Sequence, residues 1–385
     1  MPFKIIDFEQ QANIKVVGIG GAGGNAINRM VASGMRGVEF IAINTDSQDL
    51  EVSSADACIC IGESVTRGLG AGARPEVGRQ SIEEDREKVS EQLAGADLVF
   101  VTAGMGGGTG TGAAPVVAEI ARDHGAVTVG IVTEPFDFEG FPRRRNAISG
   151  IAELHDHVDT LIVIKNQRLL SICSRDTTFE EAFSKADEVL LQATRGIADL
   201  ITIPGMINLD FNDIRTVISE GGDAMIGVGT HRGEGRALEA AKKAIKSPLL
   251  EDVSIDGAKG LLINITAGSN LTLFEANEAA SIIQEAAGEE ANIIFGTVID
   301  ESLVDEIQLT VIATGFYLSQ GRFEPVAEEP AAGKRPRRMR ATERSEAIGV
   351  RAREEQGASA VTNADAPAHL RDDLDYPAIL RKKMA

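Results

Sequence analysis

Two glycine-rich segments constrain this chain more than any other feature of its sequence. Six of the nine residues from Gly104 to Gly112 are glycine, and so are five of the seven residues 18–24. Each glycine in a helix interior costs about 1 kcal/mol relative to alanine, so such segments are expected in loops rather than in helices. Both follow an apolar run and precede a helical pattern, where backbone N–H groups at a helix N-terminus bind phosphate. The alternative is that the glycines serve only tight packing of a strand against a helix.

Strand and helix patterns alternate along the first part of the chain, which predicts an α/β fold. The first strand is followed by the glycines and by a helix at 25–33. Nearly continuous apolar strands are typical of a parallel sheet covered on both faces. The expected strands are 14–19, 38–43, 97–102, 126–133 and 160–164.

Residues 179–201 carry the clearest helical pattern, with apolar side chains at 3.6-residue spacing. Thr178 followed by Glu181 is a capping box, and Pro204-Gly205 is expected to end the helix. Further strands and helices follow, so we expect a second, smaller α/β domain joined through this helix. Its expected helices are 214–220, 235–246 and 273–287, and its expected strands are 224–230, 260–267, 292–299 and 306–314.

The predicted organisation has five parts. A nucleotide-binding domain (1–178) leads into the central helix (179–203) and the second domain (204–320). Residues 321–368 contain few large apolar side chains, which predicts a disordered linker. A short C-terminal peptide (369–385) ends the sequence.

Composition excludes several classes of function. The net charge is −20, and there are no Trp and only two Tyr residues. An acidic body repels a phosphate backbone, and few aromatic rings are available for stacking on bases, so direct nucleic-acid binding by the body is not expected. The three cysteines have no metal-ligand spacing and are expected to be reduced, buried thiols. Neither a signal peptide nor a transmembrane segment is recognised, so we expect a cytoplasmic protein.

The first glycine segment alone leaves two enzyme classes open. Gly18-x-Gly20-x-x-Gly23 with Asp46 after the next strand also fits a dinucleotide fingerprint, which is typical of an oxidoreductase. The second segment, with the hydroxyls of Thr109 and Thr111, instead suggests a polyphosphate held from both sides. Because no P-loop motif occurs, the phosphates would be met by amides and a cation, most simply Mg²⁺ bound through the phosphate oxygens.

Several motifs in register resemble the tubulin/FtsZ family. The segment 106–112 looks like the family's glycine signature, and the whole of 12–318 resembles its bacterial cell-division branch. The early glycine segment, residues 44–46, the loop at 70–75 and the segment 208–213 occur in the same order. The resemblance implies GTP as the ligand, GDP as the product of hydrolysis, and head-to-tail polymerisation into filaments of the division ring. It also implies a location at the mid-cell division site beneath the membrane.

The resemblance also implies which residues bind the nucleotide. Guanine presents N–H donors and needs acceptors, which Asn166 and Asp187 can supply, while Phe183 can stack on the base. Taken alone, Asp187 could lie on a solvated helix face and Phe183 in the core. Glu139 is placed at the ribose and Arg143 near the phosphates. The remaining expected binding residues are Gly20, Gly21, Ala22, Gly23, Gly24, Asn25, Asn44, Asp46, Gly107, Gly108, Thr109, Gly110 and Thr111.

The candidate catalytic residues lie in the second domain. Asn208, Asp210 and Asp213 precede or open a predicted helix, where Asp210 could be only an N-cap and Asp213 only a first-turn acid. Carboxylates there could instead polarise a water for attack on the γ-phosphate. The family uses this loop to complete the site of the next subunit, so the same role is implied here. A nonenzymatic nucleotide-binding scaffold remains the alternative.

The C-terminal segment 371–383 places aspartates and a proline before apolar residues and ends in cations, which favours a short helix that orders on binding. It resembles the family's C-terminal peptide, which docks onto membrane-tethering adaptors and other division proteins. The basic stretch at 334–340 either contacts anionic lipid or nucleic acid or only adds solubility.

Overall fold

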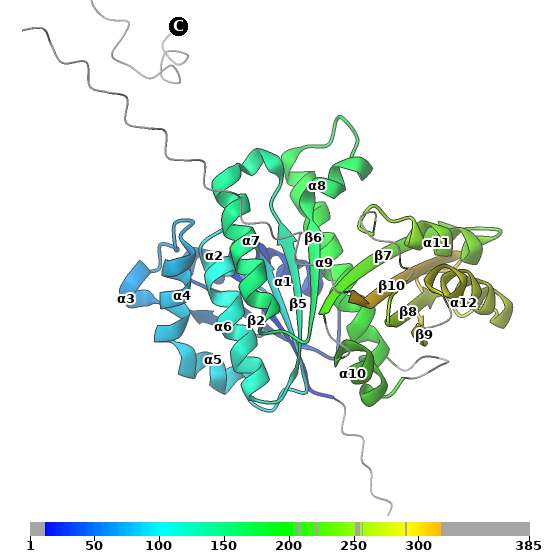
Figure 1. Cartoon of the computed structure of the whole chain (residues 1–385), viewed down its shortest axis with the longest axis horizontal. Helices are drawn as coiled ribbons and strands as arrows, with labels where there is room; N and C mark the ends of the chain where they lie inside the picture. The colour runs from blue at the N-terminus through cyan, green and yellow to red at the C-terminus, as the bar shows by residue number, and fades with distance from the viewer. Residues whose placement is uncertain are drawn as a thin grey trace, which may run out of the picture. The chain divides into compact units, whose positions relative to one another are not determined.

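A single ten-stranded sheet organises the computed structural model of this chain (Figure 1), in the order β3-β2-β1-β4-β5-β6-β7-β10-β8-β9. The structure describes residues 12–316 apart from 204, 206, 208, 220, 221, 251–254, 256, 289 and 290. The expected linker, the C-terminal peptide and the basic stretch at 334–340 lie outside the described residues.

The first six strands are parallel, as the apolar runs predict. β1 pairs with β2 and β4, β2 with β3, β4 with β5, and β5 with β6. All six residues of β1 are buried, which is typical of a strand covered on both faces. The bounds are β1 Ile14–Ile19, β2 Glu39–Asn44, β3 Ala57–Cys60, β4 Leu98–Gly104, β5 Val127–Glu134 and β6 Thr160–Lys165.

Helices cover both faces of this half of the sheet. One apolar core joins α1 and α9 to one face, and a second joins α4, α5, α6 and α7 to the other. The sequence patterns missed α4, α5 and α7, whose buried stripes are narrow; α5, for example, buries only Val89 and Leu93. The bounds are α1 Gly20–Ala32, α2 Ser47–Glu51, α3 Glu63–Thr66, α4 Pro75–Glu84, α5 Arg86–Leu93, α6 Thr109–Asp123, α7 Phe141–His155 and α8 Asn166–Leu169, with 3-10 turns at Asp137–Glu139 and Leu170–Ile172.

Two helices begin inside the glycine-rich segments, which the sequence interpretation placed in loops. α1 starts at Gly20, and α6 includes Gly110 and Gly112. Close packing explains the exception: a Cβ added at Gly112 would lie 2.0 Å from the carbonyl oxygen of Pro75 in α4. The helical cost of glycine is therefore offset by contacts that no larger residue allows.

The central helix α9 (Phe179–Thr202) confirms the capping box. The Thr178 hydroxyl oxygen accepts from the N–H of Glu181 at 3.2 Å, and the Glu181 carboxylate accepts from the N–H of Thr178 at 2.7 Å. Its 24 residues span about 36 Å at 1.5 Å per residue. Side chains of α9 share one core with both halves of the sheet.

The second half of the sheet is mixed. β10 is antiparallel to β7 and β8, while β8 and β9 are parallel. This half is joined to the first through the sheet as well as through α9, because β6 and β7 pair over three residues. α11 and α12 cover one face in a third core. The bounds are α10 Phe211–Ser219, β7 Gly222–Arg232, α11 Arg236–Ile245, β8 Gly260–Ala267, α12 Leu273–Ala287, β9 Asn292–Ile299 and β10 Glu306–Phe316.

The three cysteines are free, as expected, but they are not all buried. Cys58 is exposed, and Cys60 and Cys173 are partly exposed. Cys58 and Cys60 lie on β3, the edge strand of the sheet, which pairs with β2 on one side and, among the described residues, has no neighbouring strand on the other. The expectation of three buried thiols is therefore wrong.

An ion pair holds the first turn of α12 against α11. Arg236 is 5% exposed, and its Nε donates to the carboxylate of Glu275 at 2.7 Å. Glu275 also closes a capping box with Thr272. Hydrogen bonding to Arg236 lowers the pKa of Glu275 to about 2, with smaller contributions from Thr272. This pair fixes where the N-terminus of α12 lies.

We expect Glu275→Ala to reduce the free energy of unfolding by about 2 kcal/mol, because it leaves the buried guanidinium without its carboxylate. The depressed pKa means that this contribution is complete above the unfolded value, near 4.5, and is lost as the pH falls towards 2. Urea unfolding at pH 7 measures the loss. Glu285→Ala, which removes an exposed acid from the same helix, is the control and should change stability by less than about 0.5 kcal/mol. Equal losses in both variants would contradict the assigned role of the pair.

Candidate functional site

A cavity of about 260 Å³ lies where strands β1, β4 and β5 end. Both glycine-rich segments contribute to it, together with residues that follow β5 and β6 and residues from the start of α9. Ligands of open α/β sheets bind at this edge, outside the carboxyl ends of parallel strands. The lining residues are Ile19, Gly20, Gly21, Ala22, Gly104, Met105, Gly107, Gly108, Thr109, Gly110, Thr133, Pro135, Glu139, Arg143, Asn166, Phe183, Ala186 and Asp187.

The N-termini of α1 and α6 meet at this cavity without side-chain caps. Neither helix has a capping hydrogen bond from a side chain or an acid in its first turn. By contrast, α9 and α12 both have complete capping boxes. The first N–H groups of a helix need acceptors, and two uncapped N-termini side by side favour an anion. The arrangement suits a phosphate chain.

Glycine is required where these two segments approach each other. Gly20 has φ +71°, and a Cβ there would lie 3.1 Å from the backbone N of Gly110. A Cβ at Gly107 would meet nothing within 4 Å, so this residue borders open space. Behind the segments, the hydroxyls of Thr45 and Thr109 are hydrogen-bonded at 2.6 Å and tie α6 to the loop after β2.

The opposite wall carries the acceptors expected for a base. Asn166 is 4% exposed, and its Oδ1 is one of the buried side-chain atoms without a hydrogen-bond partner among the described residues. Phe183, on α9, packs edge-on against Phe136 at 5.4 Å between ring centroids. Asp187 lies one turn further along the same helix. An orphaned buried acceptor, a ring and a carboxylate together fit a base that presents N–H donors.

Burial raises the pKa of Asp187 to about 6, and the nearby positive charge of Arg29 opposes this shift. Arg29, on α1, also donates a hydrogen bond to the hydroxyl of Ser184 on α9. The guanidinium therefore ties the last turn of α1 to α9. The sequence interpretation did not single out Arg29, because nothing in the local pattern of α1 distinguishes it from a solvated cation.

Glu139 and Arg143 lie together at the mouth of the cavity. The Glu139 carboxylate accepts from the N–H of Phe136 at 2.9 Å and pairs with Arg143 at 2.5 Å. Glu139 is largely buried, whereas Arg143 is about half exposed. A held carboxylate suits a ribose hydroxyl, and a half-exposed cation suits a phosphate.

Some of the expected binding residues do not line this cavity. Three of them form hydrogen bonds within neighbouring loops and turns instead. The carboxylate of Asp46 caps α2, accepting from the N–H of Gln48 at 3.0 Å. The side-chain oxygen of Asn44 accepts from the N–H of Thr45 at 2.8 Å. The Thr111 hydroxyl accepts from the N–H of Gly106 at 2.8 Å. The expected residues absent from the lining are Gly23, Gly24, Asn25, Asn44, Asp46 and Thr111.

Other lining residues escaped the sequence interpretation. Thr133 and Pro135 come from the end of β5, and Ala186 from the face of α9 that also carries Phe183. Thr133 could have been predicted from its position, because it lies at the carboxyl end of a central strand. Nothing in the sequence marks Ala186.

The candidate catalytic acids lie far from this cavity along α9. Phe183 and Asp187 are near the start of that helix, whereas Asp210 and Asp213 follow its end. Figure 1 shows α8 and α10 towards opposite ends of the body. Asp210 caps α10, accepting from the N–H of Asp213 at 2.8 Å, and both residues are exposed. Asn208 lies outside the described residues.

Within residues 12–316, as far as the structure describes them, no group of three or more His, Cys, Asp or Glu side chains could hold a metal ion. Among the described helices none is long and apolar enough to cross a membrane.

Comparison with known proteins gives matches over both halves of the chain. Residues 13–174 match the family described as "Tubulin/FtsZ family, GTPase domain", and residues 222–317 match "FtsZ family, C-terminal domain". An FtsZ dimer from M. jannaschii is similar at 46% identity and a TM-score of 0.77, covering 80% of this chain and 89% of that one.

Two proteins from Haloferax volcanii share the fold at lower identity. CetZ1, a GDP-bound monomer, has 22% identity and a TM-score of 0.70, over 82% of this chain and 98% of that one. CetZ2, a GTPγS-bound protofilament, has 20% identity and a TM-score of 0.68, over 81% of this chain and 96% of that one.

Proposed function

This chain belongs to the tubulin/FtsZ family of GTPases, and from that premise we propose that it polymerises head to tail, with each subunit completing the active site of the next. GTP is its ligand and substrate, and GDP is the product. Membership in a GTPase family also sets aside the oxidoreductase alternative. The observation that carries the proposal is the separation of the cavity from the two exposed acids by the part of α9 that follows Asp187.

The uncapped N-termini of α1 and α6 hold the phosphates in this proposal. Their amides supply donors at fixed positions, and Gly107 leaves room for the γ-phosphate. Mg²⁺ would bind through the phosphate oxygens, where it neutralises charge that develops in phosphoryl transfer. Arg143 adds a cation at the mouth of the cavity.

The base is held on the other side by Asn166, Phe183 and Asp187. The unpartnered Oδ1 of Asn166 and the Asp187 carboxylate accept from guanine N–H groups, and the ring of Phe183 covers the base. An adenine ring requires a donor for its N1, which a carboxylate does not provide. The Asp187 carboxylate must be ionised to accept both of the guanine N–H bonds.

GTP affinity is therefore expected to fall between pH 7 and pH 5, with a midpoint near the pKa of about 6 that burial gives Asp187. The raised pKa means that the acceptor form is lost as the pH decreases through this value. Fluorescence titration with a labelled GTP analogue measures the profile. Asp187→Asn should bind weakly at both pH values and flatten the profile; an unchanged profile would remove Asp187 from base recognition.

Exposed apolar side chains at two ends of the body support head-to-tail contact. Phe138 and Phe179 are exposed beside the cavity, with ring centroids 5.3 Å apart. At the other end, Leu273 and Phe274 open α12 directly after β8, and both are exposed. Ile207 lies at this end too, since its N–H donates to Thr297 near the end of β9 at 3.2 Å.

These two surfaces differ from each other, so a contact between them is heterologous and continues into an open filament. The surface with Ile207 also carries Asp210 and Asp213. A neighbour docked on the cavity end would bring these carboxylates to the γ-phosphate, where they polarise the attacking water. Asn208 belongs to the same proposed set. The M. jannaschii protein is a dimer by its title, which supports self-association here.

Phosphate release as a function of protein concentration tests this function. We expect the rate per subunit to be almost undetectable at low concentration and to rise steeply above a threshold, because the site is complete only between subunits. Light scattering on the same samples reports assembly. A rate per subunit that is constant across concentrations would contradict the shared site, and no release at any concentration would favour the scaffold alternative.

Resemblance to the family and the pattern of the C-terminal segment support a proposed wider role. The chain would form filaments of the cytokinetic ring, in the cytoplasm beneath the membrane at mid-cell. Residues 371–383 would bind membrane-tethering adaptors and other division proteins. In this assignment, residues 1–178 bind GTP, 179–203 form the central helix, 204–320 supply the acids, and 321–368 link them to the C-terminal peptide 369–385.

A further inference from the structure

Arg29 connects helices α1 and α9 beside the base side of the nucleotide cavity. It lies in the last turn of α1, and its guanidinium donates to the hydroxyl of Ser184 on α9. Ser184 is three residues before Asp187, and residues three apart lie on one face of a helix. The hydrogen bond therefore holds the guanidinium on the face of α9 that carries Asp187.

Burial works against the ionised form of Asp187. This residue lines the cavity but is only partly exposed, and burial raises the pKa of its carboxyl to about 6. The positive charge of Arg29 opposes the shift. Without that charge, the neutral carboxyl would persist to a higher pH. A neutral carboxyl carries a proton on one oxygen and cannot accept from both guanine N–H groups.

Other charged groups near this carboxylate have partners of their own. Glu139 and Arg143, which also line the cavity, pair with each other at 2.5 Å. On α9 itself, Lys185 donates to a backbone carbonyl at 3.3 Å, and Glu188 accepts from a glutamine amide at 3.4 Å. Among the described residues, only Arg29 adds a charge that shifts the pKa of the buried acid.

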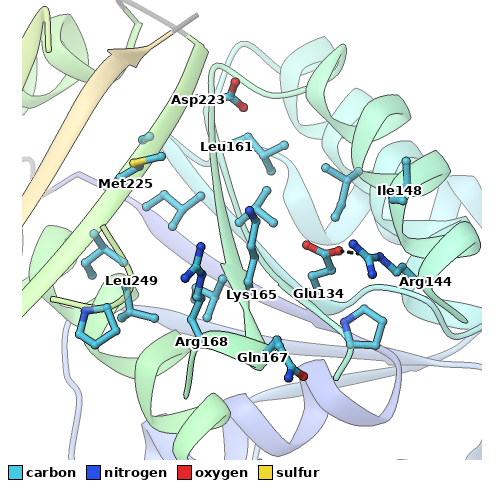
Figure 2. A pocket seen from close by; sticks show the side chains of 18 of the residues that line it. Glu134, Arg144, Ile148, Leu161, Lys165, Gln167, Arg168, Asp223, Met225 and Leu249 are labelled. Carbon is cyan, nitrogen blue, oxygen red and sulfur yellow. Dashed lines mark ion pairs between the residues drawn. The ribbon is translucent and has the colours of Figure 1, made fainter. Parts of the chain in front are cut away.

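The charged residues of β5, β6 and α8 face a different space. They line a second cavity, of about 580 Å³, where strands β6 and β7 separate (Figure 2). The two cavities share only Pro135 among their lining residues. The acids and bases that line the second cavity are Glu134, Asp137, Asp223, Arg144, Lys165 and Arg168. Because α1 contains no other charged residue, Arg29 is the cation that α1 places beside Asp187.

We propose that Arg29 is a positioning residue for GTP binding: its charge, held beside Asp187 by Ser184, keeps the guanine acceptor ionised and so sets the pH range in which GTP binds. This inference rests on the proposed role of Asp187 in guanine recognition. Arg29 does not line the cavity, so it acts on the base through Asp187.

The alternative is that Arg29 serves only the packing of α1 on α9, with a cation that also suits the C-terminus of a helix. Arg195 shows that simpler arrangement. It lies on α9 and donates to the carbonyl and hydroxyl oxygens of Ser33, at the end of α1, at 2.9 and 2.7 Å. Eight residues, about 12 Å along the helix, separate it from Asp187. The two arginines tie the same helices together, and only their distance from Asp187 differs.

Fluorescence titration of the full chain with a labelled GTP analogue, from pH 5 to pH 8.5, tests the inference. Arg29→Gln should raise the midpoint of the affinity profile by about one pH unit. Near pH 6 its affinity should be about fivefold below that of the wild type, whereas at pH 8.5 the two should agree within about twofold. Arg29→Lys keeps the charge and should restore most of the shift.

Three further variants separate charge from packing. Arg195→Gln is the matched control, since it removes the other arginine tie and should leave the midpoint unchanged. Ser184→Ala removes the hydrogen bond but not the charge, and should shift the midpoint less than Arg29→Gln does. In protein that already carries Asp187→Asn, Arg29→Gln should have no further effect on the pH dependence, because the two residues act as one unit.

An unshifted midpoint in Arg29→Gln would overturn the inference. A loss of affinity that is equal at every pH would do so too, because packing alone would then explain it, as would an equal shift in Arg195→Gln or Ser184→Ala. The wild-type profile distinguishes these results from a failure of the proposed function. If that profile has no midpoint near pH 6, Asp187 does not recognise the base and both proposals are wrong.

Discussion

Asp213→Ala is expected to reduce GTP turnover by about 100-fold or more while leaving GTP affinity unchanged. A positioned carboxylate that polarises an attacking water contributes about 10²–10⁴ to a rate. Asp213 is exposed at the start of α10 and does not line the nucleotide cavity, so its loss removes no contact with bound GTP. Phosphate release above the assembly threshold and equilibrium GTP binding measure the two quantities separately.

Asp210 requires a different substitution, because it also caps α10. Asp210→Asn keeps an acceptor for the N–H of Asp213 and removes only the charge. Turnover should fall by about tenfold or more if the charge is catalytic, and the free energy of unfolding should change little. If turnover is unaffected by this change and reduced only in Asp210→Ala, the carboxylate serves the helix and not the reaction.

An acid elsewhere on the surface provides the control for both variants. Asp156, after α7, is 82% exposed and takes no part in the nucleotide cavity. Asp156→Ala removes one negative charge of the same kind and should leave binding, assembly and turnover within about twofold, as for most surface substitutions. A loss of turnover in this variant as large as in Asp213→Ala would indicate a general effect of net charge.

Elements that carry their own boundary signals could be predicted from the sequence. The capping box at Thr178 locates the start of α9, and α12 begins at the expected residue, after the capping pair of Thr272 and Glu275. β8 and β9 also have the expected bounds, since each is a mainly apolar run with a charged residue next to one end, Lys259 before β8 and Asp300 after β9. In these places local chemistry and tertiary packing favour the same structure.

The rest of the fold depends on contacts between distant residues. Gly112 is helical because α4 packs against it, and the sequence of α6 alone gives no sign of that neighbour. The three-residue pairing of β6 with β7 joins the two halves of the sheet, and three residues are too few to produce a pattern. Likewise, the cavity between these strands exists only because they separate.

Of the expected site residues, those assigned to the base all line the cavity. Buried Asn166 and partly buried Asp187 line the cavity, where the guanine assignment requires them. Asp46 and Asn44 lie behind the cavity lining and bond within the loop after β2. The distance of Asp46 and Asn44 from the expected phosphate site depends on how this loop folds back. The spacing of these residues along the sequence does not determine that fold.

Mixing two inactive variants is expected to restore turnover, and this is the most direct test of a site shared between subunits. Asp187→Ala subunits lack the guanine acceptor and leave their own pocket empty at limiting GTP, but they retain Asp210 and Asp213. Asp213→Ala subunits bind GTP but cannot complete a neighbour's site. In an equal mixture, about a quarter of random head-to-tail contacts join an intact pocket to intact acids. Turnover should therefore exceed the sum of the separate rates by about tenfold or more.

The double variant Asp187→Ala/Asp213→Ala provides the matched control, since it mixes and assembles in the same way but brings no intact pair of acids. Its mixture with Asp213→Ala should show no recovery. If recovery is absent from the first mixture as well, although scattering shows that the two variants assemble together, the acids act within their own subunit or not at all. Recovery in both mixtures would assign hydrolysis to a group other than Asp213. Only acids supplied by a neighbour restore the first mixture and leave the second inactive, because the part of α9 from Asp187 to Thr202, about 22 Å long at 1.5 Å per residue, separates the two parts of each subunit's machinery.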